Sequence, residues 1–271
     1  LLLGGLLVAV TDEKVRHTAG YFFARPGDTF AAMWRAASSA YVAMFHGAVY
    51  NPSGAGLSGK LYPLTETLTV ATPLILAGLG VALAFRAGLF NIGAQGQILV
   101  GATLAAWVGF SWHLPAGVHL LAVLAAGALG GAVWGGIVGL LKARTGAHEV
   151  ILTIMLNYVA LNLVAWLLTL PGFQREGSSN PISPAVDENA MFPKLLGEHF
   201  RLHWGFVVAV LATVAVAWLL NRSTVGFELR AVGANPRAAR TAGISVTRGF
   251  VVVMLLAGML AGLAGTAQIL S

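Results

Sequence analysis

The chain contains 271 residues, of which 57% are hydrophobic and only 10% are charged, and its formal net charge is +6. Soluble globular chains are roughly 45–50% apolar and about 25% charged, so the composition excludes an ordinary soluble domain and favours a bilayer as the solvent. The chain has no cysteine, which excludes disulfide bonds and thiolate metal sites. The basic residues lie mainly between apolar runs, an arrangement that serves membrane orientation and predicts no nucleic-acid partner.

Apolar stretches of about 20 residues predict membrane-spanning helices, because that length crosses roughly 30 Å of hydrocarbon. A partial run at 1–10 opens the chain and another at 249–270 ends it. Between them, full candidates occupy 64–85, 88–109, 117–141, 149–170 and 203–220. We therefore expect an all-α polytopic membrane protein, a bundle of transmembrane helices in which 1–271 form a single domain truncated at both ends.

The segments between the spans carry Pro, Ser, Asn and acidic residues, which are typical of exposed connections. Segment 11–62 is expected to be an outer segment with an amphipathic helix, which either lies on the membrane surface or spans it. The core spans should occupy 64–220, followed by a cytoplasmic loop at 221–248 and a partial span at 249–271.

Lys and Arg in the connections predict the orientation of the chain in the membrane. The loop at 221–248 holds five Arg residues, and the connection at 142–148 holds Lys142 and Arg144. The positive-inside rule places both in the cytoplasm. Counting spans from there places Arg86 inside and the long connection at 171–202 outside.

The run GLFNIGAQGQ, residues 88–97, places Asn91, Gln95 and Gln97 in or beside an otherwise apolar span. At helical spacing Asn91 and Gln95 share one face and Gln97 points elsewhere, so one face could line a polar path and the other could bond a neighbouring helix. Hydrogen bonding between helices without any solute contact is the equally open alternative. The glycines of this run permit either close helix approach or a departure from regular helix beside a cavity.

A second polar pair, Thr153 and Asn157, lies four residues apart in the span at 149–170 and is expected to face the same path. The alternative is structural, because a Thr can bond its own helix backbone and an Asn can bond a partner helix. A four-residue repeat of glycine in the preceding span predicts close helix packing rather than a direct function; it comprises Gly127, Gly131, Gly135 and Gly139.

The run GFELRAVGANPRAARTAGI, residues 226–244, predicts a helical elbow in the cytoplasmic loop. It begins like a helix, turns near Asn235 and resumes as a short Ala-rich helix that ends at Gly243. Such an elbow favours docking to a partner, whereas an ordinary basic loop would serve orientation alone. The candidate docking residues are Glu228, Arg230, Gly233, Asn235, Pro236, Ala238, Ala239 and Gly243.

Other classes of function lack the residues they need. The run GAGLSGK, Gly54–Lys60, has phosphate-loop spacing, but no strand precedes it and Leu61 stands where Ser or Thr would bind Mg²⁺. A membrane-embedded enzyme is disfavoured because the GxSxG and HExxH motifs are absent. A secondary carrier would need an ionisable group near the bilayer midplane, and the sequence offers none there. A passive pore is harder to exclude from composition, but the elbow has no obvious purpose in one.

Three runs together resemble the inner-membrane permeases of bacterial ABC importers for branched-chain amino acids, ribose and nucleosides. They are AFRAGLFNIGAQGQILVGA, KARTGAHEVILTIMLNY and GFELRAVGANPRAARTAGI, and the last two look most like the nucleoside and simple-sugar branch. By this resemblance, residues 226–244 correspond to the segment that couples to an ATPase, and residues 91–97 lie near the translocation path. Relatives commonly carry Glu where this chain has Gln95, so a role that needs a charge there is in doubt.

The resemblance also implies the partners and the location of the chain. A second permease subunit, identical or paralogous, would complete the pathway in the bacterial inner membrane. An extracytoplasmic solute-binding lipoprotein or periplasmic protein would deliver the solute, and cytosolic ATPases would carry ATP and Mg. No cofactor is expected on this chain, which is then not an enzyme. A nucleoside is the first choice of solute, a simple sugar such as ribose the second, and a branched-chain amino acid the third.

Overall fold

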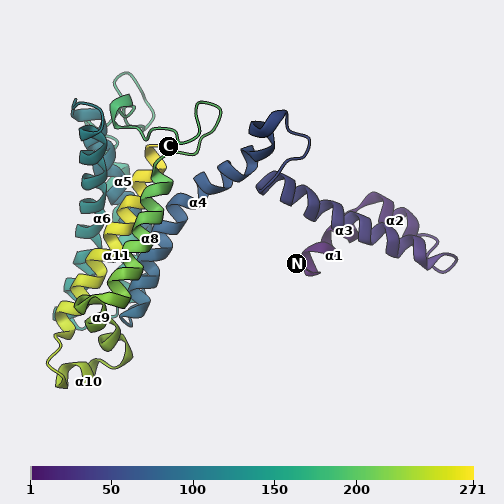
Figure 1. Ribbon diagram of the computed structural model, residues 1–271. Coiled ribbons are helices and arrows are strands. Elements are labelled where there is room, and N and C mark those ends of the chain that lie inside the picture. The colour runs from purple at the N-terminus through teal and green to yellow at the C-terminus, as the bar shows by residue number, and fades with distance from the viewer. Residues whose placement is uncertain (1) are drawn as a thin grey trace. The chain divides into compact units, whose positions relative to one another are not determined.

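The computed structural model describes residues 2–271, which fold into α-helices joined by loops (Figure 1). Extended structure in the described chain is limited to isolated bridges, so the expected all-α class is confirmed. The residues form two compact units. One runs up to Leu68 and includes Glu198–Phe200, and the other comprises Thr69–Gly197 with Arg201–Ser271.

The N-terminal unit contains α1 (Leu2–Thr11), α2 (Glu13–Ala19), α3 (Pro26–Ala48) and the first turns of α4 (Gly56–Arg86). The Asp12 carboxylate caps α2 by accepting a hydrogen bond from the Lys14 amide at 2.9 Å. Helix α3 confirms the helix expected within 11–62, and Pro26 suits its first turn. Helix α3 has 23 residues and is not among the helices that are long and apolar enough to cross a membrane.

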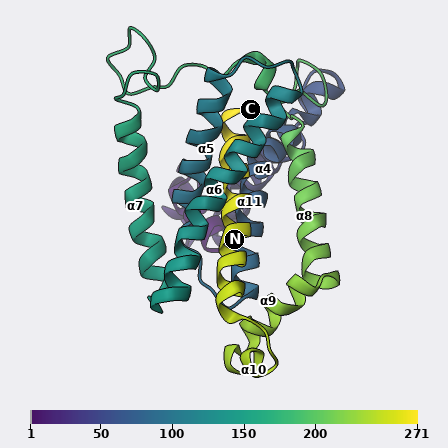
Figure 2. The same ribbon diagram turned by 90° about the vertical axis from the view of Figure 1, so that its left-hand side faces the viewer.

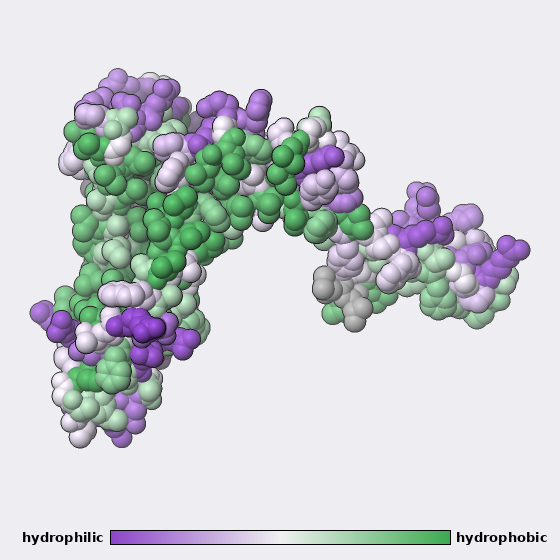
Figure 3. Space-filling view, in the orientation of Figure 1, coloured by the Kyte–Doolittle hydropathy of each residue, from purple (hydrophilic) through white to green (hydrophobic). Residues whose placement is uncertain are grey.

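The second unit is a helical bundle that continues from α4 (Figure 2). Its further elements are α5 (Ala94–Ser111), α6 (Val118–Thr145), α7 (Glu149–Leu167), η1 (Glu188–Ala190), α8 (Gly205–Arg222), α9 (Thr224–Ala234), α10 (Pro236–Thr241) and α11 (Val246–Ile269). On the face seen in Figure 3, hydrophobic residues extend along the middle of the bundle and hydrophilic residues gather toward its two ends.

Five helices of the described chain are long and apolar enough to cross a membrane, namely α4, α6, α7, α8 and α11. Helix α11 is the central one, because 61% of its apolar window is buried, against 11% for α7. Helix α4 begins at Gly56 rather than near 64, because helical hydrogen bonding continues through polar residues that a hydropathy window rejects. The expected connection at 171–202 is confirmed as a stretch whose only helix is η1.

The span predicted at 88–109 is wrong at its start. Residues 88–93 are not helical, and α5 begins only at Ala94. Gly88 has a φ of +75° and ends α4 in a Schellman turn, in which the Leu89 amide bonds the Ala84 carbonyl at 3.0 Å. This left-handed residue redirects the chain, so the apolar run is divided between a turn and a shorter helix.

The glycine repeat of α6 packs against α11, as predicted. A Cβ atom at Gly131 would clash with the carbonyl oxygen of Gly258, and one at Gly135 would clash with that of Met254. A Cβ at Gly139 would lie 2.9 Å from the Phe250 carbonyl oxygen. The absence of side chains therefore lets the two backbones approach closely, which is how helices gain packing energy in lipid.

Candidate functional site

The polar residues of 88–97 form a folded turn at the start of α5. The Asn91 carboxamide oxygen accepts a hydrogen bond from the Gly93 amide at 3.0 Å, which holds the turn before the helix begins. The Asn91 Nδ2 donates to Gln97 Oε1 at 3.1 Å, and Gln97 Nε2 donates back to Asn91 Oδ1 at 3.3 Å. The two side chains are 4% and 0% exposed, so each amide satisfies the other away from solvent.

The pairing of Asn91 with Gln97 shows that the predicted helical arrangement of Asn91, Gln95 and Gln97 is wrong. Asn91 and Gln95 were expected to share a face with Gln97 directed elsewhere, but Asn91 faces Gln97. The spacing rule fails because Asn91 precedes the helix, where the turn and not the 3.6-residue period sets its direction. Of the two roles predicted for the glycines of this run, the structure shows the departure from regular helix at residues 88–93.

Asn157 of α7 clamps the same turn from the other side. Its Oδ1 accepts a hydrogen bond from the Gly96 amide at 2.8 Å, and its Nδ2 donates to the Ile92 carbonyl at 3.0 Å. The Gly96 amide is one of the first amides of α5, which lack partners inside the helix, so Asn157 caps α5 from a neighbouring helix. A Cβ at Gly96 would lie 2.9 Å from Asn157 Oδ1, so only glycine fits this contact without a shift.

Thr153 packs against the turn before α5 and does not line the pocket that Asn157 lines. Its hydroxyl donates to the Val150 carbonyl of its own helix at 3.0 Å, and the residue is fully buried. A Cβ at Gly93 would lie 3.1 Å from the Thr153 side chain. Thr153 therefore packs against the turn, and its hydroxyl bond is the local one that the structural alternative described.

A pocket of about 370 Å³ lies beside this clamp, between the start of α5 and the face of α7. It is lined by Ile92, Gln95, Ile154, Asn157, Tyr158 and Leu161. Gln95 is exposed, and its amide bonds no side chain or backbone group of the described residues. Of the five predicted pathway residues, the structure brings Gln95 and Asn157 to this pocket and buries Asn91, Gln97 and Thr153 behind it.

Four pocket residues were not predicted from the sequence, and of these Tyr158 is the one that carries a polar group, whereas Ile92, Ile154 and Leu161 are aliphatic. Tyr158 directly follows Asn157, and this position could have indicated its role. An aromatic residue in an apolar span is, however, usually interpreted as one that faces lipid. Metal binding is not indicated, since in residues 2–271 no three His, Asp or Glu side chains gather closely enough to hold an ion.

The predicted elbow is present as α9 and α10, joined at Asn235. The Asn235 backbone is extended, with a φ of −160°, and its side chain accepts hydrogen bonds from the amides of Arg237 at 2.9 Å and Ala238 at 3.1 Å. Pro236 occupies the first turn of α10, and Gly243 ends the elbow with a φ of +82°. One residue thus both ends α9 and caps α10, which fixes the angle of the elbow.

Some of the candidate docking residues are buried within the elbow, and the others are exposed on its surface. Ala239 is buried with Val232 and Val246 in a small apolar cluster. Gly233 packs on the end of α4, where a Cβ would clash with the Arg86 carbonyl oxygen. Glu228 is partly buried, and the residues left on the surface are Arg230, Asn235, Pro236, Ala238 and Gly243.

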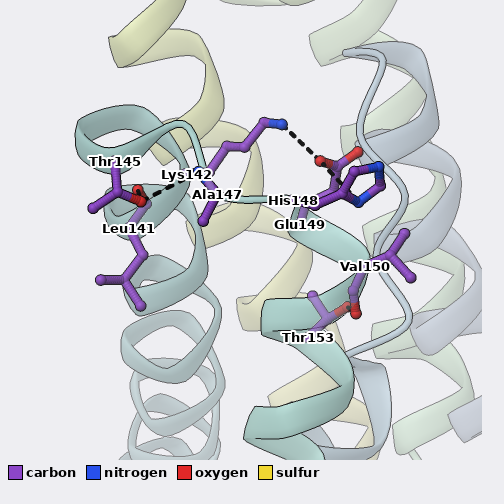
Figure 4. A network of polar contacts seen from close by, with 8 residues as sticks. All are labelled: Leu141, Lys142, Thr145, Ala147, His148, Glu149, Val150 and Thr153. Atoms are coloured by element: carbon purple, nitrogen blue, oxygen red, sulfur yellow. Dashed lines mark hydrogen bonds and ion pairs between the residues drawn. The ribbon is translucent and has the colours of Figure 1, made fainter.

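An ion pair joins α6 and α7 at the elbow end of the bundle (Figure 4). Lys142 Nζ lies 2.7 Å from Glu149 Oε2, and it also lies 5.9 Å from the centroid of the Phe250 ring. Phe250 packs against the apolar cluster of the elbow. The basic connection at 142–148, the end of α4 at Arg86 and the elbow therefore lie at one end of the bundle, which agrees with the predicted topology.

Comparison with known proteins places the chain among transporter permeases. The chain is 43% identical over 227 residues to the guanosine ABC transporter permease protein NupP of Bacillus subtilis, which covers 84% of this chain and 64% of that protein. It is 41% identical over 218 residues to the glucose ABC transporter permease protein TsgB13 of Haloferax volcanii, covering 77% and 57%. It is 37% identical over 215 residues to the nucleoside ABC transporter permease protein NupB of Lactococcus lactis, covering 76% and 59%.

The chain spans less than two thirds of the length of these relatives. No solved structure matches it. The relatives are named as permease proteins rather than as enzymes, which agrees with the resemblance carried by the three sequence runs. With its five apolar helices, the chain is a multi-pass protein of the inner membrane. Because residues 64–271 match the family described as "Branched-chain amino acid transport system / permease component", the chain belongs to that family.

Proposed function

We propose that this chain is the transmembrane permease subunit of an ATP-driven ABC importer and that its solute is a nucleoside. The observation that carries the proposal is the contact between Gly233 of the elbow and Arg86 at the end of α4. The chain segment that follows Arg86 is the turn that builds the amide pocket. The elbow, which carries the exposed docking residues, therefore contacts the chain directly before the turn that forms part of the candidate solute pocket.

In this proposal Gln95 and Asn157 line the pathway, and the buried group of Asn91, Gln97 and Thr153 holds its wall in place. Asn157 is the ninth residue of α7, so it lies about 12 Å along the helix from the α6–α7 connection. Many transporters bind solutes near the midplane beside the first residues of interrupted helices, and this pocket lies beside the first residues of α5.

The partners follow from the proposed class. The exposed elbow residues, including Arg230, Pro236 and Ala238, dock to a cytosolic ATPase that holds ATP and Mg, and Gly243 ends the docking helix. A second permease subunit completes the pathway, and an extracytoplasmic solute-binding protein delivers the solute. The two relatives named for guanosine and for nucleosides support the choice of solute.

A simple sugar is the second candidate, because one relative is named as a glucose permease and amides bond hydroxyl groups as readily as base edges. A branched-chain amino acid fits less well. The pocket is lined by two amides, one tyrosine and three apolar residues. None of these side chains would neutralise the ammonium and carboxylate groups of an amino acid.

The test is uptake into vesicles that contain the full-length permease with its ATPase and solute-binding partners. Labelled nucleosides, sugars and leucine are supplied with ATP, and the control receives a non-hydrolysable ATP analogue. The proposal expects nucleoside uptake only where ATP can be hydrolysed. Uptake that is independent of ATP would overturn the importer class, and ATP-dependent uptake of a sugar alone would overturn the choice of solute.

A further inference from the structure

The pocket beside the start of α5 has one aromatic wall. Tyr158 lines the same pocket as Gln95 and Asn157, and 66% of the residue is exposed. Its hydroxyl bonds no group of the described part of the chain, and neither does the Gln95 side chain. An aromatic ring, a complete free amide and part of a second amide therefore line one open pocket.

The depth of these groups indicates that the pocket holds water or solute rather than lipid. Asn157 and Tyr158 lie in the middle of the 19 residues of α7, far from either end of the span. An unpaired amide or hydroxyl that faced hydrocarbon at this depth would carry the full cost of lost hydration. A cavity of about 370 Å³ has the size of a small-molecule site, which removes that cost by admitting polar partners.

The free groups of the pocket have the chemistry that reads a heterocyclic base. Gln95 offers both a donor and an acceptor, the pair that binds a base edge in bidentate fashion. Asn157 uses one hydrogen of Nδ2 and one lone pair of Oδ1 in the clamp, so one donor and one acceptor remain. Ile92, Ile154 and Leu161 supply the apolar part of the lining.

We infer that Tyr158 is the stacking platform of the solute site and that the pocket recognises the base of a nucleoside rather than its sugar. This inference rests on the proposed function and deepens it. A base stacks on an aromatic side chain through its π-face, which a sugar lacks, and the tyrosine hydroxyl can add a hydrogen bond at the ring edge. The sugar then lies toward the open side of the pocket.

Two measurements test this role in the complete importer. First, ATP-dependent adenosine uptake is measured for Tyr158→Phe and Tyr158→Leu, with Trp166→Leu as the control that removes an exposed ring from the same helix outside the pocket. Tyr158→Phe keeps the ring and should retain most uptake. Tyr158→Leu should raise the half-saturating concentration on the order of 10-fold or more, and Trp166→Leu should leave it unchanged.

Second, the wild-type importer is photolabelled with 8-azidoadenosine and the adducts are located by mass spectrometry. The expected adduct lies on the α7 peptide that contains residues 154–161, and free adenine but not ribose suppresses it. Adducts confined to other helices, suppression by ribose alone, or a Tyr158→Leu variant with wild-type kinetics would overturn the inference. If adenosine uptake still requires ATP in that case, the proposed function stands, whereas an importer with no nucleoside uptake at all contradicts both.

Discussion

Asn157 Oδ1 on α7 accepts a hydrogen bond from the backbone amide of Gly96, 2.8 Å away at the start of α5. The same side chain returns a hydrogen bond to the Ile92 carbonyl, so a single residue satisfies two backbone groups that the break at 88–93 leaves without helical partners. This relationship joins two helices that are far apart in the sequence, and it forms one wall of the candidate solute pocket.

Replacing Asn157 by Ala should destabilise the protein as well as reduce uptake. The change removes both hydrogen bonds and leaves the buried Gly96 amide unsatisfied, which costs about 1–3 kcal/mol, whereas water can replace Asn157 at the carbonyl of the exposed Ile92. Asn162→Ala is the matched control, because Asn162 Nδ2 bonds only the Tyr158 carbonyl of its own helix. Thermal unfolding in detergent measures the difference, and equal melting temperatures for the two variants would show that the clamp contributes nothing.

Gln95 and Gln97 should behave differently although they are two residues apart. Gln97→Ala removes the partner of the buried Asn91 amide and should lower the free energy of unfolding by about 1–3 kcal/mol. Gln95→Ala should leave the melting temperature unchanged and raise the half-saturating solute concentration by up to about 10-fold, the value of one net hydrogen bond. Unchanged uptake kinetics in a well-expressed Gln95→Ala variant would remove Gln95 from the pathway.

The contact between α6 and α11 should tolerate no side chain at Gly131. Gly131→Ala places a methyl group against the Gly258 carbonyl, so the helices must separate, at a cost of roughly 1–3 kcal/mol. Gly78→Ala is the control, because a Cβ there meets no atom within 4 Å and Ala favours the helix by about 1 kcal/mol. A Gly131→Ala protein as stable as the wild type would contradict the packing role.

Adjacent alanines in α10 should separate coupling from folding. Ala238 is exposed, so Ala238→Glu should change stability by less than about 0.5 kcal/mol and yet abolish uptake and solute-stimulated ATP hydrolysis. Ala239 is buried with Val232 and Val246, so Ala239→Glu should unfold the elbow itself. Coupled transport that survives in Ala238→Glu would exclude this surface as the ATPase contact.

The segment that directly precedes α8 should lose stability in acid through His203. Burial lowers the pKa of His203, and the positive charge of Arg201 lowers it further. The neutral ring stacks on Phe192 with centroids 5.1 Å apart, and its Nδ1 accepts a hydrogen bond from the Gly205 amide at 3.1 Å. Protonation thus favours the unfolded state, where the pKa is about 6.5.

The contribution of the neutral His203 ring to the free energy of unfolding should be complete above about pH 6.5. It should decline as the pH falls below that value toward the pKa of His203 in the folded protein. Melting temperatures between about pH 8 and pH 5 measure the decline. His203→Gln should reduce the fall in melting temperature between these pH values. His113 is exposed, so His113→Gln should show the same fall as the wild type. A wild-type acid profile in His203→Gln would mean that other groups cause the decline.

Much of the architecture could be predicted because it depends on local properties of the chain. Apolar length located α6, α7, α8 and α11 within a few residues, and Pro and Gly located the elbow. The start of α5 could not be located in this way. The run at 88–97 is apolar enough for a span, and only the left-handed Gly88 and the side-chain bonds of Asn91 show that the helix begins later.

Gln95 and Asn157 of the candidate site could be predicted from the sequence, but Tyr158 and the arrangement of these residues could not. The sequence by itself determined that polar amides interrupt an apolar membrane protein and that a glycine stripe brings helices together, because hydropathy and side-chain size are properties of single residues. Only the tertiary structure decided that Asn91 pairs with Gln97, that Asn157 clamps Gly96, and that Tyr158 joins Gln95 in one pocket. An amide bonds whichever group packs against it, and the groups that pack here come from helices distant in the chain.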